Sequence, residues 1–288
     1  MSKKNRRGAT DRPAKAKRPN IPFVERPFEG LPRESDLVAM REILPLATLS
    51  VKTTEEFGGV ELNLVTILPQ MSAGLRRDDD VLLVAIQSLT SSGDPSLDIA
   101  TNVLRSIELE PGQVLQVSEL PEPGPRLQEV LDPDSFGEIE LFTEPTFWMS
   151  ETELAKPENK EALATAREQL IPTAQVPGQP GAYWCRMSRE FLRWVRPEPR
   201  DAVLDGLARL RVAGEGSFDE SRFVGAFRAQ GLLIPVWELQ AGSEADELAE
   251  PLAEFAAQFD AAIASHEPLS SDEKRARAGI VSRQVTLR

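Results

Sequence analysis

The first half of the chain alternates short apolar runs with polar turns. Four segments have the composition of β-strands: Leu46–Lys52, Val60–Leu68, Val81–Gln87 and Gln113–Val117. The third is almost unbroken in its apolar character, which is typical of a buried strand. Apolar residues at helical spacing predict a helix from Ser96 to Ile107, and a last strand region lies at 139–149. We therefore expect a mixed α/β domain over residues 21–150.

A polar helix and a run rich in Pro and Gly separate this half from the second one. We expect residues 151–181 to form that helix and linker, and residues 182–265 to form a smaller domain rich in aromatic residues and Arg. Residues 266–288 read as a C-terminal tail. Strands at Ala182–Met187 and Leu232–Leu239 and helices at Arg200–Ala213 and Glu247–Ile263 are predicted. The fold class is α+β, with a mixed-sheet N-terminal domain and a smaller mixed α/β C-terminal domain.

Two further helices follow from local start and stop signals. Ser35 or Asp36 can cap a short helix that runs through Arg41, and Pro45 ends it. The sequence Ser217-Phe-Asp-Glu220 has the form of a capping box, which predicts a helix. That helix would carry Phe223, Val224 and Phe227.

The charges of the 288-residue chain are unevenly placed. Residues 1–20 hold eight of the 33 basic side chains and one of the 46 acidic ones, so this tail carries +7 and the remainder −20. The basic residues are Lys3, Lys4, Arg6, Arg7, Arg12, Lys15, Lys17 and Arg18. Without large apolar residues the tail is expected to be disordered, and it favours non-specific contact with nucleic acid or ribosomes. The acidic body would repel nucleic acid and anionic membranes at long range, so no membrane partner is expected.

Four arginines stand at intervals of three, four and three residues: Arg186, Arg189, Arg193 and Arg196. If this segment is helical, all four lie on one face, and the aromatic and apolar residues between them lie on the other. One interpretation is a surface that binds an anion or an acidic partner. The other is a solvated face whose arginines pair with acids of the protein itself.

No catalytic motif stands out. The chain lacks the glycine-rich phosphate loops and the zinc-protease and serine-hydrolase motifs, and it has one His and one Cys. We expect no metal site and no cofactor. Cys185 is expected to be a buried inert thiol, His266 a helix-terminal side chain, and Asp78–Asp80 a charged turn rather than a Mg²⁺ site. Trp237 is expected in the core.

Several stretches resemble a family of uncharacterised actinobacterial proteins. They are PFVERPFEGLP, ESDLVAMREILPLAT, PEPRDAVLDGLARL and LIPVWEL. The family has no established activity, and some members carry an N-terminal Cys-rich zinc motif and a translocase-like or topoisomerase-like label. Residues 1–20 contain no Cys, so zinc binding does not follow here. The single Tyr183, in an apolar context, and the short chain argue against topoisomerase chemistry.

Three functions remain open at this stage. The first is a non-catalytic interaction or adaptor protein that uses the arginine face. The second is a metal-independent enzyme that acts on a small anionic substrate through carboxylates and Arg. The third is a nucleic-acid or ribosome accessory that acts through the basic tail. The absence of a secretory signal or a long apolar run, and the single Cys, favour a cytoplasmic protein.

Overall fold

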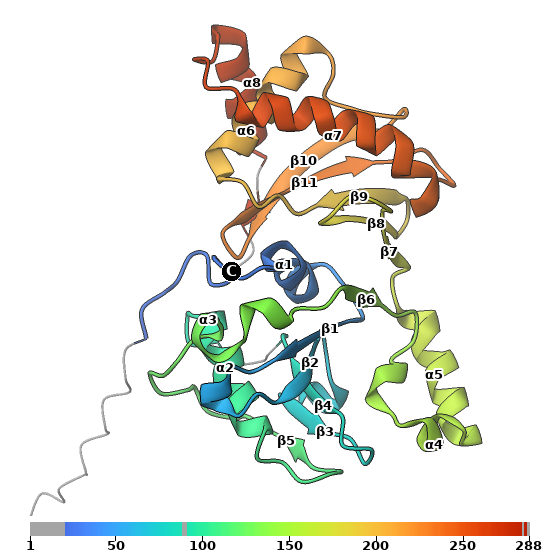
Figure 1. Ribbon diagram of the computed structural model, residues 1–288. Coiled ribbons are helices and arrows are strands. Elements are labelled where there is room, and N and C mark those ends of the chain that lie inside the picture. The colour runs from blue at the N-terminus through green and yellow to red at the C-terminus, as the bar shows by residue number, and fades with distance from the viewer. Residues whose placement is uncertain (1–20, 88–90, 284, 287–288) are drawn as a thin grey trace, which may run out of the picture.

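Two six-stranded sheets lie on either side of one short helix, α1 (Glu34–Glu42), as Figure 1 shows. The computed structural model describes residues 21–87, 91–283 and 285–286. Helices and two largely antiparallel sheets in one chain confirm the α+β fold class. None of the helices in these ranges has the length and apolar character needed to cross a membrane.

The first sheet has the strand order β5-β3-β4-β2-β1-β6. Its strands are β1 (Ala47–Lys52), β2 (Glu61–Val65), β3 (Gly74–Arg76), β4 (Leu82–Ala85), β5 (Val114–Leu115) and β6 (Ile139–Leu141). Strands β2 and β4 are parallel and the other pairs are antiparallel. Helices α1, α2 (Pro95–Ser106) and α3 (Leu127–Val130) share the core cluster on one face. The strands expected from the sequence are thus confirmed, in shorter form.

The second sheet has the order β12-β10-β11-β9-β8-β7. Its strands are β7 (Thr173–Gln175), β8 (Ala182–Arg186), β9 (Glu190–Trp194), β10 (Arg222–Ala229), β11 (Leu232–Glu238) and β12 (Val285–Thr286). Three helices lie over one face: α6 (Arg200–Ala213), α7 (Ala249–Ala264) and α8 (Ser271–Val281). Trp237 is fully buried there among five aromatic rings, so the expectation that it belongs to the core is confirmed.

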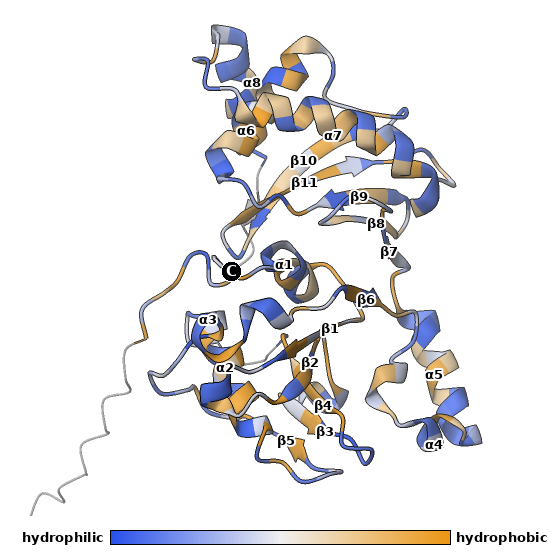
Figure 2. Cartoon of the chain, in the orientation of Figure 1, coloured by the Kyte–Doolittle hydropathy of each residue, from blue (hydrophilic) through white to orange (hydrophobic). Residues whose placement is uncertain are grey.

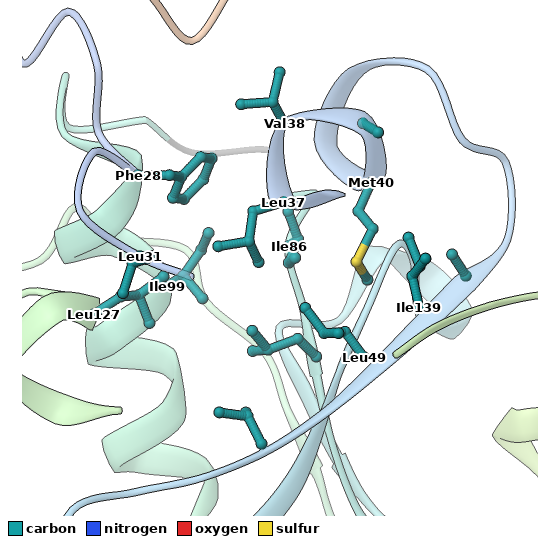
Figure 3. Packing of buried hydrophobic residues seen from close by; sticks show 14 of the residues in the cluster. Phe28, Leu31, Leu37, Val38, Met40, Leu49, Ile86, Ile99, Leu127 and Ile139 are labelled. Atoms are coloured by element: carbon teal, nitrogen blue, oxygen red, sulfur yellow. The ribbon is translucent and has the colours of Figure 1, made fainter. Parts of the chain in front are cut away.

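Helix α1 contributes to the packing of both sheets. Leu37 and Met40 are fully buried in the cluster around the first sheet, and Val38 points away from them in Figure 3. The same cluster contains Tyr183, Val195, Ala229, Leu232 and Ile234 from the second half. The two halves therefore share one core across α1. The division into domains near residue 181 stays a prediction about folding units.

The polar connection between the halves forms α4 (Glu151–Leu154) and α5 (Pro157–Gln169), followed by the extended edge strand β7. Figure 2 shows hydrophilic colours prevailing in α4 and in α8. Helix α8 lies in the segment expected to be a tail, and it packs on α6 through a face that buries Ile280.

The prediction of a helix after the capping box at 217–220 is wrong, because the segment that follows forms the strand β10. Asp219 and Glu220 have φ values of 42° and 55°, in the left-handed region, which no helix continues. The hydroxyl of Ser221 instead accepts a hydrogen bond from the backbone N–H of Phe218, and β10 begins directly afterwards. Pairing along the length of β11 stabilises this segment as a strand.

Candidate binding cleft beside the central helix

Arg186, Arg189, Arg193 and Arg196 do not lie on a helix, so the prediction that they share one helical face is wrong. The segment forms the β8–β9 hairpin, in which successive side chains point to opposite faces. Arg186 and Arg196 lie with the tryptophans of the helix-covered face, whereas Arg193 pairs in register with Tyr183 on the opposite face. The structure therefore does not bring the four together on one surface.

Three of these arginines are engaged by acids of the protein itself. Arg186 contacts Glu190 and Glu244 at 2.9 and 2.5 Å and lies over the ring of Trp184. Arg189 pairs with Glu238. Arg196, with a side chain only 6% exposed, contacts Glu198 and Asp260 and lies over the Trp194 and Phe259 rings. These contacts fix the hairpin and leave little free capacity for a partner.

Arg193 differs from the other three. It forms no ion pair and no side-chain hydrogen bond with the described residues, and its Nε is buried without an acceptor. An unsatisfied buried donor of this kind is uncommon, and it calls for a physical explanation.

A cavity of ligand size lies elsewhere, beside the C-terminal end of α1. It is an open cleft of about 640 Å³, which is within the usual size range of sites for small organic ligands. Four segments that are far apart in sequence line it: residues 23–25, the end of α1, the loop 91–95 that leads into α2, and the β10–β11 turn. The loop follows the carboxyl end of β4, where α/β sheets commonly place ligands.

The β10–β11 turn reaches the cleft because its backbone permits a very close approach. Gln230 and Gly231 have φ values of 49° and 86°, as a two-residue hairpin turn with left-handed central residues requires. A Cβ at Gly231 would lie 2.7 Å from Cβ of Arg26 and 2.9 Å from the carbonyl oxygen of Glu25. Only glycine allows the turn to pack on the segment 21–26 (Figure 1).

Two guanidinium groups line the cleft. Arg41 extends from the last turn of α1 and donates a hydrogen bond from Nη1 to the carbonyl oxygen of Ile86 at 2.7 Å. Burial lowers the pKa of Arg41, and the nearby charges of Glu42 and Asp98 oppose this. Arg228 extends from β10 and pairs with Glu25. The site thus holds two cations: Arg41, which is costly to bury, and Arg228, which already binds the carboxylate of Glu25.

Hydrogen bonds join the segments that line the cleft. Gln230 donates a hydrogen bond from Nε2 to Oε1 of Glu42 at 2.6 Å, and so ties the hairpin to α1. The backbone N–H of Val24 donates to the carbonyl oxygen of Gly93 at 2.9 Å, and so ties the N-terminal segment to the loop before α2. The apolar part of the lining includes Phe23, whose side chain is 73% exposed, and Pro95.

Sequence reasoning missed this cleft. Of its residues, Arg41 was named only as the end of a predicted helix, and residues 23–25 only as part of a stretch that resembles a family. A signal was present in Gly231, because glycine readily adopts the positive φ that a two-residue hairpin turn requires. The pairing of that turn with residues 23–26 is a long-range contact, and no local pattern encodes it.

The other residues considered from the sequence lie outside the cleft. Cys185 is fully buried and His266 is exposed beyond α7. Tyr183 donates a hydrogen bond from its hydroxyl to Oδ1 of Asp36 at 2.8 Å, and burial raises its pKa. Asp78–Asp80 form a charged turn, in which Asp80 pairs with Arg76 and Asp79 pairs with Arg77. The basic residues of the tail lie outside the described residues.

Residues 27–288 match the Family of unknown function (DUF5926), and the chain belongs to that family. This agrees with the resemblance to an uncharacterised family noted from the sequence. No curated protein and no solved structure shows a significant match to the chain.

Proposed function

We propose that this protein is a non-catalytic binding protein that holds a small anionic organic ligand in the cleft beside α1. The observation that carries the proposal is the cleft itself, because two guanidinium groups from opposite halves of the chain, Arg41 and Arg228, line one cavity of ligand size. Guanidinium groups are the usual protein partners of carboxylate and phosphate.

The chemistry of the lining favours binding over catalysis. Its ionisable side chains, among the described residues, are Glu25, Arg41 and Arg228. Guanidinium groups stay protonated near neutral pH, so they do not exchange protons with a substrate. Glu25 is 66% exposed and already paired with Arg228, so it lacks the buried setting that tunes a general base. For this reason the binding function is preferred to the enzyme hypothesis.

A titration of the full-length protein tests the proposal. Acetate, benzoate, phenyl phosphate and inorganic phosphate are added at constant ionic strength, and binding is followed by ligand-observed NMR and calorimetry. We expect at least one organic anion to bind, and Arg41→Gln and Arg228→Gln to weaken it at least about tenfold. Arg222→Gln is the matched control, since it removes an exposed guanidinium at the other end of β10. Binding that is equal in all variants, or absent throughout, refutes the proposal.

A specific observation favours a second function, namely docking of an acidic protein segment at Arg193. The Arg193 residue as a whole is partly exposed and forms no ion pair with the described residues, so an acidic partner would supply the carboxylate that its guanidinium lacks. Pull-down from lysate with the unaltered chain and with Arg193→Met tests this: a partner held by Arg193 disappears in the variant. A partner retained by Arg193→Met speaks against the site.

A further inference from the structure

We propose that the ligand is an organic monocarboxylate with an apolar or aromatic body, and that its carboxylate replaces Glu25 on Arg228. This inference rests on the proposed function, and it specifies the class of ligand and the way in which the site opens. Three features of the cleft support it: the ion pair between Glu25 and Arg228, the charges around the cleft and its apolar wall.

The carboxylate of Glu25 pairs with the guanidinium of Arg228 in the way that a ligand carboxylate would. The Arg228 side chain is 24% exposed, whereas the Glu25 side chain is 66% exposed and lies at a bend in the N-terminal segment. An ion pair with one partner this exposed contributes little stability, so a competing carboxylate displaces it at low cost.

The charge balance favours one negative charge over two. Glu42 lies 3.7 Å from Arg41 and accepts the hydrogen bond from Gln230, so it stays in place when a ligand enters. With Glu25 displaced, Arg41 keeps Glu42 and Asp98 as its acidic neighbours, and Arg228 is the cation left for the ligand. A monocarboxylate then neutralises Arg228, whereas a phosphate dianion leaves an excess negative charge near Glu42 in a partly buried space.

The rest of the cleft suits an apolar body. Phe23, Val24 and Pro95 form apolar parts of the lining, and Gly93 and Gly231 contribute backbone without side chains. Phe23 is 73% exposed, and a single aromatic side chain left in solvent at the rim of a cavity gains burial when a ligand ring packs against it.

The experiment compares matched probes on the full-length chain at constant ionic strength. Benzoate and phenylacetate are the expected ligands, benzyl alcohol tests the need for charge, acetate tests the apolar body, and phenyl phosphate tests the preference for one charge. Ligand-observed NMR detects millimolar affinities. We expect the two aromatic carboxylates to bind at least about tenfold more tightly than the other three.

The variant Glu25→Gln separates displacement from simple attraction. It removes the competitor for Arg228, so we expect affinity for benzoate to rise about threefold to tenfold. Glu29→Gln is the control, because Glu29 is 68% exposed and lies on the same segment outside the lining, and it should leave affinity unchanged. Equal affinity in the unaltered chain and in Glu25→Gln overturns the displacement.

The outcomes distinguish this inference from the proposed function. If phenyl phosphate binds more tightly than benzoate, and Arg228→Gln abolishes that binding, the cleft is an anion site but the monocarboxylate assignment is wrong. If no aromatic carboxylate binds at 10 mM, about the limit of weak ligand recognition, the inference is overturned. If no anion binds in an Arg41- or Arg228-dependent way, the proposed function fails as well.

Discussion

Substitution of Gly231 by Ala tests whether the close packing of the β10–β11 turn on residues 21–26 positions the cleft. Alanine at φ 86° costs about 1–2 kcal/mol for the left-handed backbone. Its Cβ would also lie 2.7–2.9 Å from backbone and Cβ atoms of Glu25 and Arg26, which cannot rotate away. The segment must therefore move, and Arg26 would lose its two contacts of 2.6 and 2.7 Å to the buried Glu34. Leaving Glu34 without this partner adds about 2–3 kcal/mol.

The expected loss for Gly231→Ala is thus about 3–5 kcal/mol in the free energy of unfolding. Gly242→Ala is the matched control, because Gly242 has φ 88° but no heavy atom within 4 Å of an added Cβ. The control should lose only the backbone term of about 1–2 kcal/mol. Urea unfolding measures both values, and limited proteolysis reports cleavage near residues 21–27. Equal losses in the two variants, with no new cleavage, refute the argument that this contact positions the segment.

Two further predictions concern the second sheet. Trp237→Ala should lower the free energy of unfolding by about 3–5 kcal/mol, because it empties a fully buried aromatic site and leaves the carbonyl of Gly216 without its donor, and urea unfolding measures this. A loss below 1 kcal/mol would contradict the packing. Arg193→Met should raise stability by about 1 kcal/mol because it removes a buried donor without an acceptor. Arg189→Met should change little, since the Arg189 side chain is 67% exposed and Glu238 keeps Arg222 as a partner. A large loss at Arg193 in the same urea assay would mean that its guanidinium has a stabilising partner.

Local sequence signals predicted much of the fold where they agreed with packing. Helix α6 was expected at Arg200–Ala213 and has those bounds, because Gly214 ends it in the left-handed conformation. The strand β11 and the amphipathic helix α7 were also anticipated from their apolar spacing. The capping box at 217–220 failed because a local signal competed with the pairing of β10 along the whole length of β11.

The arginine face failed for a related reason. Intervals of three, four and three residues fit a helix, and they fit a hairpin equally well when the turn falls between Arg186 and Glu190. Sequence spacing does not say which acids will lie near each guanidinium. The partners Glu244, Glu238 and Asp260 are between 49 and 64 residues away from the arginines they contact. Only the folded sheet brings them together.

The polar groups of α1 explain why the cleft depends on both halves of the chain. Near the start of the helix, Asp36 accepts a hydrogen bond from the hydroxyl of Tyr183, and burial raises the pKa of that carboxyl while the hydrogen bond lowers it. At the end of the helix, Glu42 accepts from Gln230, next to Arg41. Each end of α1 is thus tied to the second sheet by a polar contact, while its apolar face packs on the first. Because Arg41 stands on this helix and Arg228 on β10, the separation of the two guanidinium groups is set by the packing of the second sheet on α1.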